Sequence, residues 1–273
     1  MTLLATDLNK IKKIFNTKSW NTDEDDLFND MCKAIELLDD DEKELFFFLT
    51  NKFLRIQDTD FFSKIDSALK KLVIPKDINK IVIIPLLKEQ DFNRIKSSSM
   101  FVYNLKQQLR RIYKLELPIY TSNNYKNISQ KIDEQTMLMI PDDFIGSGNY
   151  AKEFIEELHN LYNTAKITFI TIASLKTGED LIKSLNCEIY SCHHLTKGIE
   201  DDNSIDLDKK NKYYKILHKL SEKLDIELQY EKGLYNSEAL ISFLKVPNNT
   251  FGLYWCVSKK GKELKWPQIF QRF

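Results

Sequence analysis

Long hydrophobic runs, paired cysteines and an excess of charge of either sign are all missing from this sequence of 273 residues. The longest apolar runs, such as residues 45–49, are far too short to span a membrane. The start of the chain has neither the basic region nor the apolar stretch of a secretion signal. Four cysteines lack the spacing of a disulfide framework, so we expect reduced thiols in a cytoplasmic protein with no membrane contact.

Charge is balanced, with 40 lysines and arginines against 40 aspartates and glutamates. No overall basic field therefore favours nucleic acid, and scattered lysines place nucleic-acid binding last among the function classes. A hydrophobic content of 42% with 29% charged residues is typical of a soluble globular protein. The length suffices for a large core, as one big domain or one domain with an appended piece.

Glycine is scarce at 7 residues, which makes a Gly-Ser-Gly sequence in the middle of the chain notable. Four apolar residues, 137–140, form a short run typical of a buried parallel strand that stops at Pro141. Asp142 and Asp143 follow at once. After two more apolar residues comes the glycine loop, residues 146–149, and then the apolar stripe of a helix. The order is strand, acids, glycine loop, helix.

This order suits a phosphorylated ribose. Glycines allow backbone N–H groups to turn inward, and the first turn of a helix leaves its own N–H groups unpaired, so the loop can hold a phosphate. Asp142 and Asp143 offer acceptors for neighbouring sugar hydroxyls or for a hydrated divalent cation. Two other interpretations exist: acids that merely cap a strand end, and a dinucleotide-binding loop, whose glycines would follow the strand directly.

The same residues resemble the signature of type I phosphoribosyltransferases: an apolar strand, two acids, two apolar residues, one variable residue, Thr or Ser, and Gly. The resemblance implies that the two acids hold the 2′ and 3′ hydroxyls of phosphoribosyl pyrophosphate, while loop amides hold its 5′-phosphate. It makes the two aspartates the catalytic candidates. The implied phosphoribosyl-binding residues are Asp142, Asp143, Gly146, Ser147, Gly148, Asn149 and Tyr150.

Two departures from that signature concern catalysis more than binding. Tyr150 stands where the family usually has a small hydroxyl residue against the phosphate. Gly146 stands where some members carry an acid that assists the incoming base. A catalytically degenerate protein of the same fold, which senses a nucleotide or binds a partner, is therefore the alternative function.

The first part of the chain, residues 1–78, reads as a helical region without catalytic equipment. Residues 3–15 carry apolar side chains at helical spacing. Acids at residues 39–42 fit a helix start, for which capping is a far more frequent role than metal binding. A third helical stretch, residues 61–72, precedes Pro75.

Residues 79–273 read as an α/β domain with a docked C-terminal tail. Short β-branched or apolar runs predict strands at residues 81–84, 117–120, 167–172, 188–191 and 239–243, in addition to residues 137–140. Helical patterns separate most of them. This alternation predicts a parallel sheet flanked by helices, with the ligand beyond the carboxyl ends of its strands, where the acids lie.

The loop after the first of these strands is the only candidate for binding pyrophosphate. The resemblance places that role there, on backbone and small residues, although the loop is longer than usual and lacks the common glycines. A hydroxyl triplet at a helix start is by default an N-cap. The candidate residues are Lys96, Ser97, Ser98 and Ser99.

Two further segments invite a functional interpretation. Cys187, Cys192, His193 and His194 are potential metal ligands, but their spacing fits no zinc pattern and a strand turns neighbouring side chains to opposite faces, so we expect no metal there. Residues 197–212 are charged and poor in apolar side chains, which predicts a surface loop that could serve as a flap.

The ending extends the resemblance to essentially the whole chain. An Asn-Asn-Thr sequence, Trp255, a Trp266-Pro267 pair and a closing aromatic-x-Arg are similar to the phosphoribosyltransferase-like (PRTase-CE) domain of bacterial conflict systems that defend against phage. This implies phosphoribosyl pyrophosphate or a related nucleotide as ligand, Mg²⁺ bound through the substrate, displacement of pyrophosphate by a nitrogen nucleophile, and a protein partner in defence.

Overall fold

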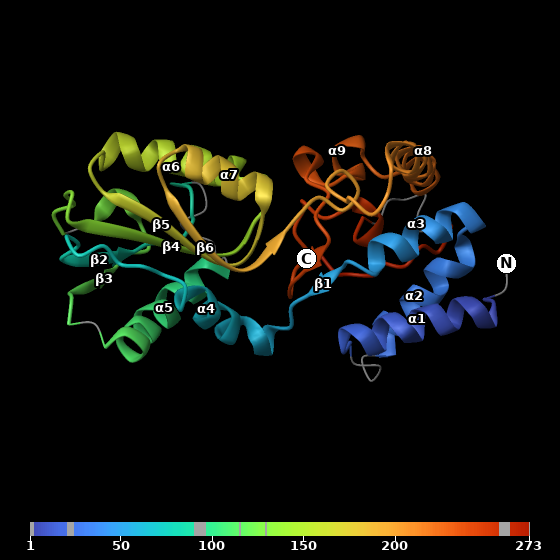
Figure 1. Cartoon of the computed structure of the whole chain (residues 1–273), viewed down its shortest axis with the longest axis horizontal. Helices are drawn as coiled ribbons and strands as arrows, with labels where there is room; N and C mark the ends of the chain where they lie inside the picture. Colours follow the sequence, from blue (N-terminus) through green and yellow to red (C-terminus); the bar gives the residue numbers. More distant parts are fainter. Residues whose placement is uncertain are drawn as a thin grey trace. The chain divides into compact units, whose positions relative to one another are not determined.

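A computed structural model describes residues 3–20, 25–89, 97–114, 116–128, 130–256 and 263–272. The chain forms two compact units, one of Met1–Asp58 with Thr196–Phe273 and the other of Thr59–Leu195 (Figure 1). This grouping differs from the division at residue 79 that the sequence suggested. The C-terminal segment joins the N-terminal helices in the first unit, and the helix after residue 60 belongs with the sheet in the second.

The second unit is built on one parallel sheet with the strand order β3-β2-β4-β5-β6. Its strands are β2 (Lys80–Ile83), β3 (Ile119–Thr121), β4 (Thr136–Ile145), β5 (Lys166–Leu175) and β6 (Glu188–Leu195). All neighbouring pairs run parallel. The predicted α/β class, a parallel sheet flanked by helices, is therefore confirmed.

Helices cover both faces of this sheet (Figure 1). On one face, α5 (Ser97–Tyr113) packs on β2, β3 and β4, while α4 (Phe61–Leu69) packs on β5 and β6. On the other lie α6 (Asn149–Leu161) and α7 (Lys176–Ser184). The apolar stripe of α6 is fully buried in the cluster that includes Leu138, Ile140 and Phe169 of the sheet. Burial of this stripe, rather than helix propensity, is what holds α6 in place.

Strand β4 is longer than the sequence predicted. It was expected to stop at Pro141, but it continues through both aspartates to Ile145. Pairing with β2 ends at Met139, whereas pairing with β5 continues to Ile145. Proline cannot donate a ladder hydrogen bond, and it is tolerated in β4 because the strand has lost one neighbour by that point.

The strand order places a topological switch point between β2 and β4. From β2 the chain first moves outward to β3 and then returns to the other side as β4, β5 and β6. Parallel sheets with this winding bind ligands beyond the carboxyl ends of the strands at the switch point. The aspartates and the glycine loop lie at the carboxyl end of β4, which is this location.

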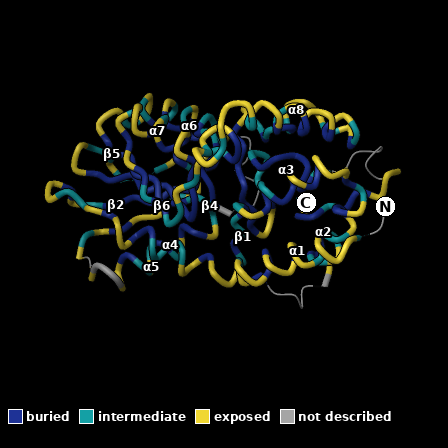
Figure 2. Tube along the Cα trace, turned by 45° about the vertical axis from the view of Figure 1, so that its right-hand side comes forward, coloured by how far each residue is buried: buried dark blue, intermediate teal, exposed yellow. Residues whose placement is uncertain are grey.

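The first unit combines N-terminal and C-terminal elements around its own core. Its helices are α1 (Ala5–Lys18), α2 (Asp25–Leu37), α3 (Asp40–Thr50), α8 (Leu207–Leu224) and α9 (Leu228–Glu231), and β1 (Leu54–Arg55) pairs in parallel with β7 (Ile241–Ser242). Among the described residues of the whole chain, short 3-10 turns are η1 (Asp58–Asp60), η3 (Tyr125–Asn127), η4 (Leu234–Asn236) and η5 (Gly252–Tyr254). The predicted last strand thus lies outside the main sheet. Figure 2 shows the buried inner sides of α1, α3 and α8.

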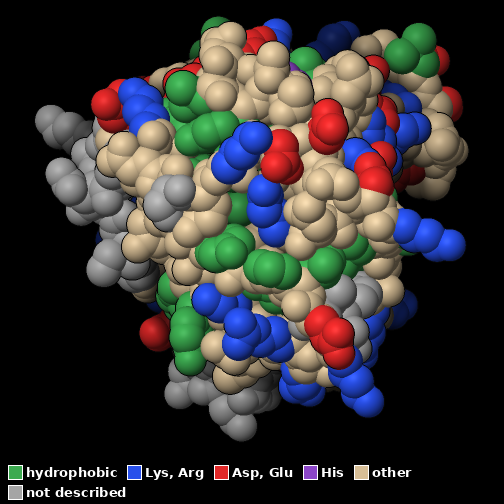
Figure 3. Space-filling model, turned by 90° about the vertical axis from the view of Figure 1, so that its left-hand side faces the viewer, with side chains coloured by type: hydrophobic (Ala, Val, Ile, Leu, Met, Phe, Trp, Pro, Cys, Tyr) green, Lys and Arg blue, Asp and Glu red, His purple; other side chains and the backbone are tan. Residues whose placement is uncertain are grey.

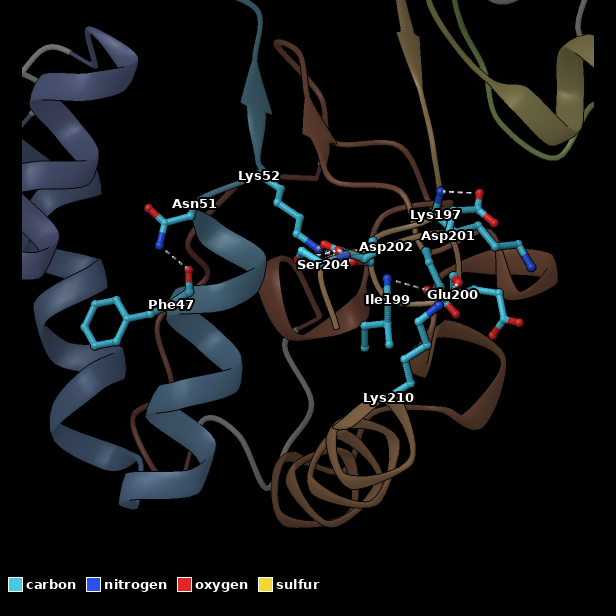
Figure 4. A network of polar contacts seen from close by, with 12 residues as sticks. Phe47, Asn51, Lys52, Lys197, Ile199, Glu200, Asp201, Asp202, Ser204 and Lys210 are labelled. Atoms are coloured by element: carbon cyan, nitrogen blue, oxygen red, sulfur yellow. Dashed lines mark hydrogen bonds and ion pairs between the residues drawn. The ribbon is translucent and has the colours of Figure 1, made fainter. Parts of the chain in front are cut away.

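Residues 197–206 are tied down rather than forming a free flap (Figure 4). Lys52 reaches Asp202 in an ion pair and donates to the carbonyl oxygen of Gly198 at 2.7 Å. Burial alone would raise the pKa of Asp202, but hydrogen bonds from Lys52 and Ser204 lower it to about 2. The buried carboxylate of Glu238 accepts two backbone N–H groups from the same segment. Helix α8 then begins at Leu207, so the prediction of a loop up to residue 212 was wrong.

No helix within the described ranges is both long and apolar enough to cross a membrane. The four cysteines are free thiols. Burial raises the pKa of the Cys187 thiol to about 12, which keeps it protonated and makes it a poor metal ligand.

Candidate functional site

Asp142 and Asp143 lie near the end of β4 and are half-buried. Asp142 is in register with Thr171 of β5, which is in register with Ser191 of β6. On its other side, β4 extends beyond the last residue that pairs with β2, and Asp142 stands about 10 Å past that point at the usual rise of a strand. The acids therefore lie past the part of β4 that pairs with β2, on a part that still pairs with β5, at the switch point of the sheet.

The loop of residues 146–148 turns the chain directly from β4 into α6. Gly146 and Gly148 are buried and Ser147 is half-buried. Gly148 is the N-cap of α6 and has φ 81° and ψ −9°, the left-handed region that favours glycine. The Ser147 hydroxyl lies 3.3 Å from Nδ2 of Asn149. The predicted strand, acids, glycine loop and helix thus occur in that order and in one place.

The N-terminus of α6 is suited to an anion. Its N-cap is a glycine, which has no side-chain acceptor, and there is no acid in the first turn. The backbone N–H of Asn149 donates to the Ser147 hydroxyl over a long distance of 3.4 Å. A helix of 13 residues carries a partial positive charge at this end, which favours a phosphate there.

Tyr150, in the first turn of α6, is held by the segment after β2. Its hydroxyl accepts the backbone N–H of Lys88 at 3.2 Å, and the Lys88 ammonium lies 4.5 Å from the centre of its ring. The same ammonium pairs with Glu153 one turn later in α6. The side chain of Tyr150 therefore joins α6 to the segment that follows β2, while its backbone belongs to the first turn.

Gly178 in α7 contacts the glycine loop, and the sequence pattern did not predict this contact. A Cβ atom placed on Gly178 would lie 2.3 Å from the carbonyl oxygen of Gly146. One placed on Gly148 would lie 3.0 Å from Cα of Gly178. The backbone of the loop thus packs directly on the first turn of α7, and only glycines permit that approach.

The candidate pyrophosphate loop is only partly within the described residues. Lys96 lies outside them, and the structure describes Ser97 only as the first residue of α5. Ser98 is 1% exposed, and its hydroxyl has no hydrogen-bond partner within the described part of the chain. Ser99 is half-buried. Helix α5 connects β2 to β3, which runs parallel to β2, so the start of α5 lies at the carboxyl edge of the sheet. The candidate ligand site lies at the same edge.

A buried polar network beside the site also escaped the sequence interpretation. Thr171, Ser174 and Ser191 are fully buried, and the Thr171 and Ser191 hydroxyls are 2.7 Å apart. Glu179 accepts from Ser174 and lies 2.6 Å from Nδ1 of His194. The signal in the sequence was Thr171 and Ser174 within β5, a strand that is otherwise mostly apolar, whereas Ser191 lies among polar neighbours in β6.

Among the described residues, no group of three or more His, Cys, Asp or Glu side chains could hold a metal ion. A single half-buried carboxylate at this strand end is enough to hold Mg²⁺ that keeps most of its waters. Two hollows of about 540 and 390 Å³ lie in the first unit, around Lys43 and around Trp255. Neither is lined by a residue that the sequence singled out for binding.

A model of the PRTase-CE family matches residues 25–272. The chain belongs to this family. The resemblance inferred from the signature and the C-terminal tail is thereby confirmed, and the match covers both compact units. No curated protein matches the chain in sequence.

Solved structures similar to this PRTase-CE chain include phosphoribosyltransferases. Orotate phosphoribosyltransferase from Aeropyrum pernix is 14% identical, with 58% of this chain and 74% of that chain covered and a TM-score of 0.32. Hypoxanthine phosphoribosyltransferase from Trypanosoma cruzi, in complex with its product IMP, is 12% identical, with coverages of 54% and 80% and a TM-score of 0.34. A hypothetical protein from Neisseria gonorrhoeae with bound ppGpp is 14% identical, with coverages of 60% and 97% and a TM-score of 0.33.

Proposed function

We propose that this PRTase-CE chain binds phosphoribosyl pyrophosphate, or a nucleotide that shares its ribose 5-phosphate, at the carboxyl end of β4. The observation that carries the proposal is the position of two adjacent aspartates and a glycine-capped helix start at the switch point of the sheet. Asp142 and Asp143 would accept hydrogen bonds from the ribose hydroxyls. The amides of residues 146–150 would hold the 5′-phosphate.

The reaction that suits such a site is transfer of the phosphoribosyl group. A nitrogen nucleophile forms a bond to C1′, the bond from C1′ to the pyrophosphate oxygen breaks, and pyrophosphate leaves with the electron pair. The proton of the nucleophile passes to solvent or to the leaving group. Because the transition state resembles an oxocarbenium ion, the protein contributes mainly position and electrostatic support.

Mg²⁺ is the cofactor that this chemistry calls for. When bound, it would neutralise charge on the departing pyrophosphate. Substrate oxygens and water would supply most of its ligands, and Asp142 and Asp143 would hold its water shell through hydrogen bonds. The aspartates thus act on the ribose and on the hydrated cation together.

A second candidate function is binding without turnover, in which the chain senses a nucleotide or serves a protein partner in phage defence. The observation that favours it is the engagement of Tyr150 by Lys88, at a position where a small hydroxyl would otherwise face the phosphate. Such a protein would retain the ligand and release no pyrophosphate.

Calorimetric titration with phosphoribosyl pyrophosphate and Mg²⁺, and separately with ribose 5-phosphate, tests the proposal. We expect the wild-type chain to bind both. Replacing Asp142 and Asp143 together by Asn should weaken binding at least about tenfold, because hydrogen bonds from ligand hydroxyls to charged acceptors are lost. Release of pyrophosphate on adding a base would separate transfer from binding alone.

The matched control is Asp40→Asn with Asp41→Asn, which neutralises two adjacent exposed acids in the first turn of α3. This control should bind as the wild type does. Equal affinity of the wild type and the Asp142/Asp143 variant would disprove the site assignment. Melting temperatures of both variants show whether each is folded.

A further inference from the structure

Glu179 is a buried carboxylate in the first turn of α7, with its side chain 10% exposed. Its Oε1 accepts the hydroxyl proton of Ser174 and lies 2.6 Å from Nδ1 of His194. Its Oε2 lies 3.7 Å from the ammonium of Lys183. A buried carboxylate is costly unless it is hydrogen-bonded, so these contacts fix the place of Glu179 and of the helix turn that carries it.

The contacts of His194 set the direction of its hydrogen bonds. Its Nε2 lies 3.4 Å from the ammonium of Lys71, which also donates to the carbonyl oxygen of Ser191 at 2.7 Å. An ammonium can only donate, so Nε2 is the acceptor and the proton of the neutral ring is on Nδ1. His194 therefore donates to Glu179, and the chain of hydrogen bonds runs from Lys71 through His194 to α7.

The turn that Glu179 fixes is the one that touches the candidate phosphate loop. Gly178, the preceding residue, approaches the carbonyl oxygen of Gly146 so closely that a Cβ atom would lie 2.3 Å from it. A shift of the first turn of α7 must therefore move the loop or open a gap beneath it.

Strand register connects the two ends of this arrangement. His194 of β6 is the partner of Ser174 in β5, and Ser174 is the partner of Ile145, the last residue of β4 before the loop. The network thus joins β5 and β6, and its member Ser174 lies in register with Ile145, the last residue of β4 before the loop.

We infer that His194 and Glu179 are a positioning pair, which holds α7 against the glycine loop and thereby sets the affinity of the loop amides for the 5′-phosphate. The inference rests on the proposed function for its ligand. In this arrangement, neither His194 nor Glu179 contacts the ligand. His194 acts through Glu179, and Glu179 acts through the backbone of Gly178.

The first test needs no ligand. Backbone ¹⁵N order parameters of Gly146 and Gly148 are measured in the wild type, in His194→Ala and in His194→Asn. In His194→Ala we expect them to fall from the rigid value of about 0.85 toward 0.6, because the donor to Glu179 is lost. Asn can place an amide N–H near the position of Nδ1, so His194→Asn should restore them in part.

The second test measures the affinity for ribose 5-phosphate by calorimetry. His194→Ala removes the hydrogen bond from His194 to the charged Glu179, and we expect it to weaken the binding of ribose 5-phosphate about tenfold. His194→Asn should recover most of the lost affinity. A residue that only supports the fold would lower the melting temperature without this recovery of affinity.

His218→Ala is the matched control. In the first unit, Nδ1 of His218 lies 2.9 Å from the buried carboxylate of Glu231, and the two side chains are 55% and 8% exposed, against 54% and 10% for His194 and Glu179. This variant loses the same kind of pair and should leave both the order parameters of the loop and the affinity unchanged.

Unchanged order parameters in His194→Ala would overturn the inference. Lower order parameters in a protein whose wild type does not bind ribose 5-phosphate would support the mechanical link and overturn the proposed function instead. An equal loss of affinity in His194→Ala and His218→Ala would also overturn the inference, because the effect would then be one of general stability.

Discussion

Gly148 is the residue on which the proposed phosphate loop depends most directly. Its backbone lies in the left-handed region, and any Cβ atom would approach the backbone of Gly178 at 3.0 Å. Both features require glycine, for different reasons: the first is intrinsic to L-residues, and the second is a tertiary contact with α7.

We predict that Gly148→Val abolishes measurable binding of ribose 5-phosphate. A β-branched residue in the left-handed region costs at least about 1–2 kcal/mol, and its side chain would push the loop away from α7. Calorimetry gives the affinity, and circular dichroism confirms the helical content. Normal binding by this variant would mean that the loop is not where the phosphate is held.

Tyr150 departs from the family signature, and the structure gives its side chain packing partners. In the sequence it only replaces a small hydroxyl residue. In the structure its ring and hydroxyl contact Lys88, and the Lys88 ammonium also pairs with Glu153. Lys88 thereby links the segment after β2 to α6. The substitution thus has a packing partner of its own.

At the scale of elements, local signals placed most helices and strands within a few residues of their observed bounds. The acids of residues 39–42 are an example. The Asp39 side chain accepts the backbone N–H of Glu42, and the Glu42 side chain accepts that of Asp39, a complete capping box for α3. The capping interpretation of these acids is therefore confirmed.

Asp39→Ala should lower the free energy of unfolding by about 1 kcal/mol, since one of the unpaired N–H groups of the helix start loses its acceptor. Urea denaturation measures the change. Asp40→Ala removes the neighbouring acid, which is not the cap, and should change the free energy by less than about 0.5 kcal/mol. Equal losses in the two variants would show that helix-dipole charge, and not the cap, is what matters.

For the whole molecule, zero net charge is matched by surface charges of mixed sign. On the face drawn in Figure 3, lysine and arginine side chains lie among acidic and hydrophobic ones rather than in a single stripe.

The stability of the first unit depends on a core to which both ends of the chain contribute. Phe270 stacks on Phe53 with ring centres 4.4 Å apart, and the indole N–H of Trp266 donates to the carbonyl oxygen of Leu253.

Phe270→Ala should destabilise the protein by about 3–5 kcal/mol, because it removes a buried aromatic ring from this core. Removal of residues 266–273 should lower the melting temperature further. Leu264→Ala is the control: Leu264 is 38% exposed, and its loss should cost under about 0.5 kcal/mol. An unaltered melting temperature in the truncated chain would show that the tail contributes nothing to the fold.

The sequence by itself determined the fold class and the order of the candidate site. Strand, acids, glycine loop and helix are consecutive in the chain, so local patterns were enough to place Asp142, Asp143 and Gly148. Periodicity likewise located the parallel strands, because each buried strand must be apolar. The end of β4 was misplaced, since whether a proline ends a strand depends on the neighbours that the strand has there.

Only the tertiary structure decided what surrounds those residues. The approach of Gly178 to Gly146, the pairing of Glu179 with His194, and the joining of the C-terminal tail to the N-terminal helices all connect positions far apart in the chain or on different elements. No spacing in the sequence encodes them. They follow from the parallel register of β4, β5 and β6 and from the return of the chain to its first helices, which are settled only when the whole core packs.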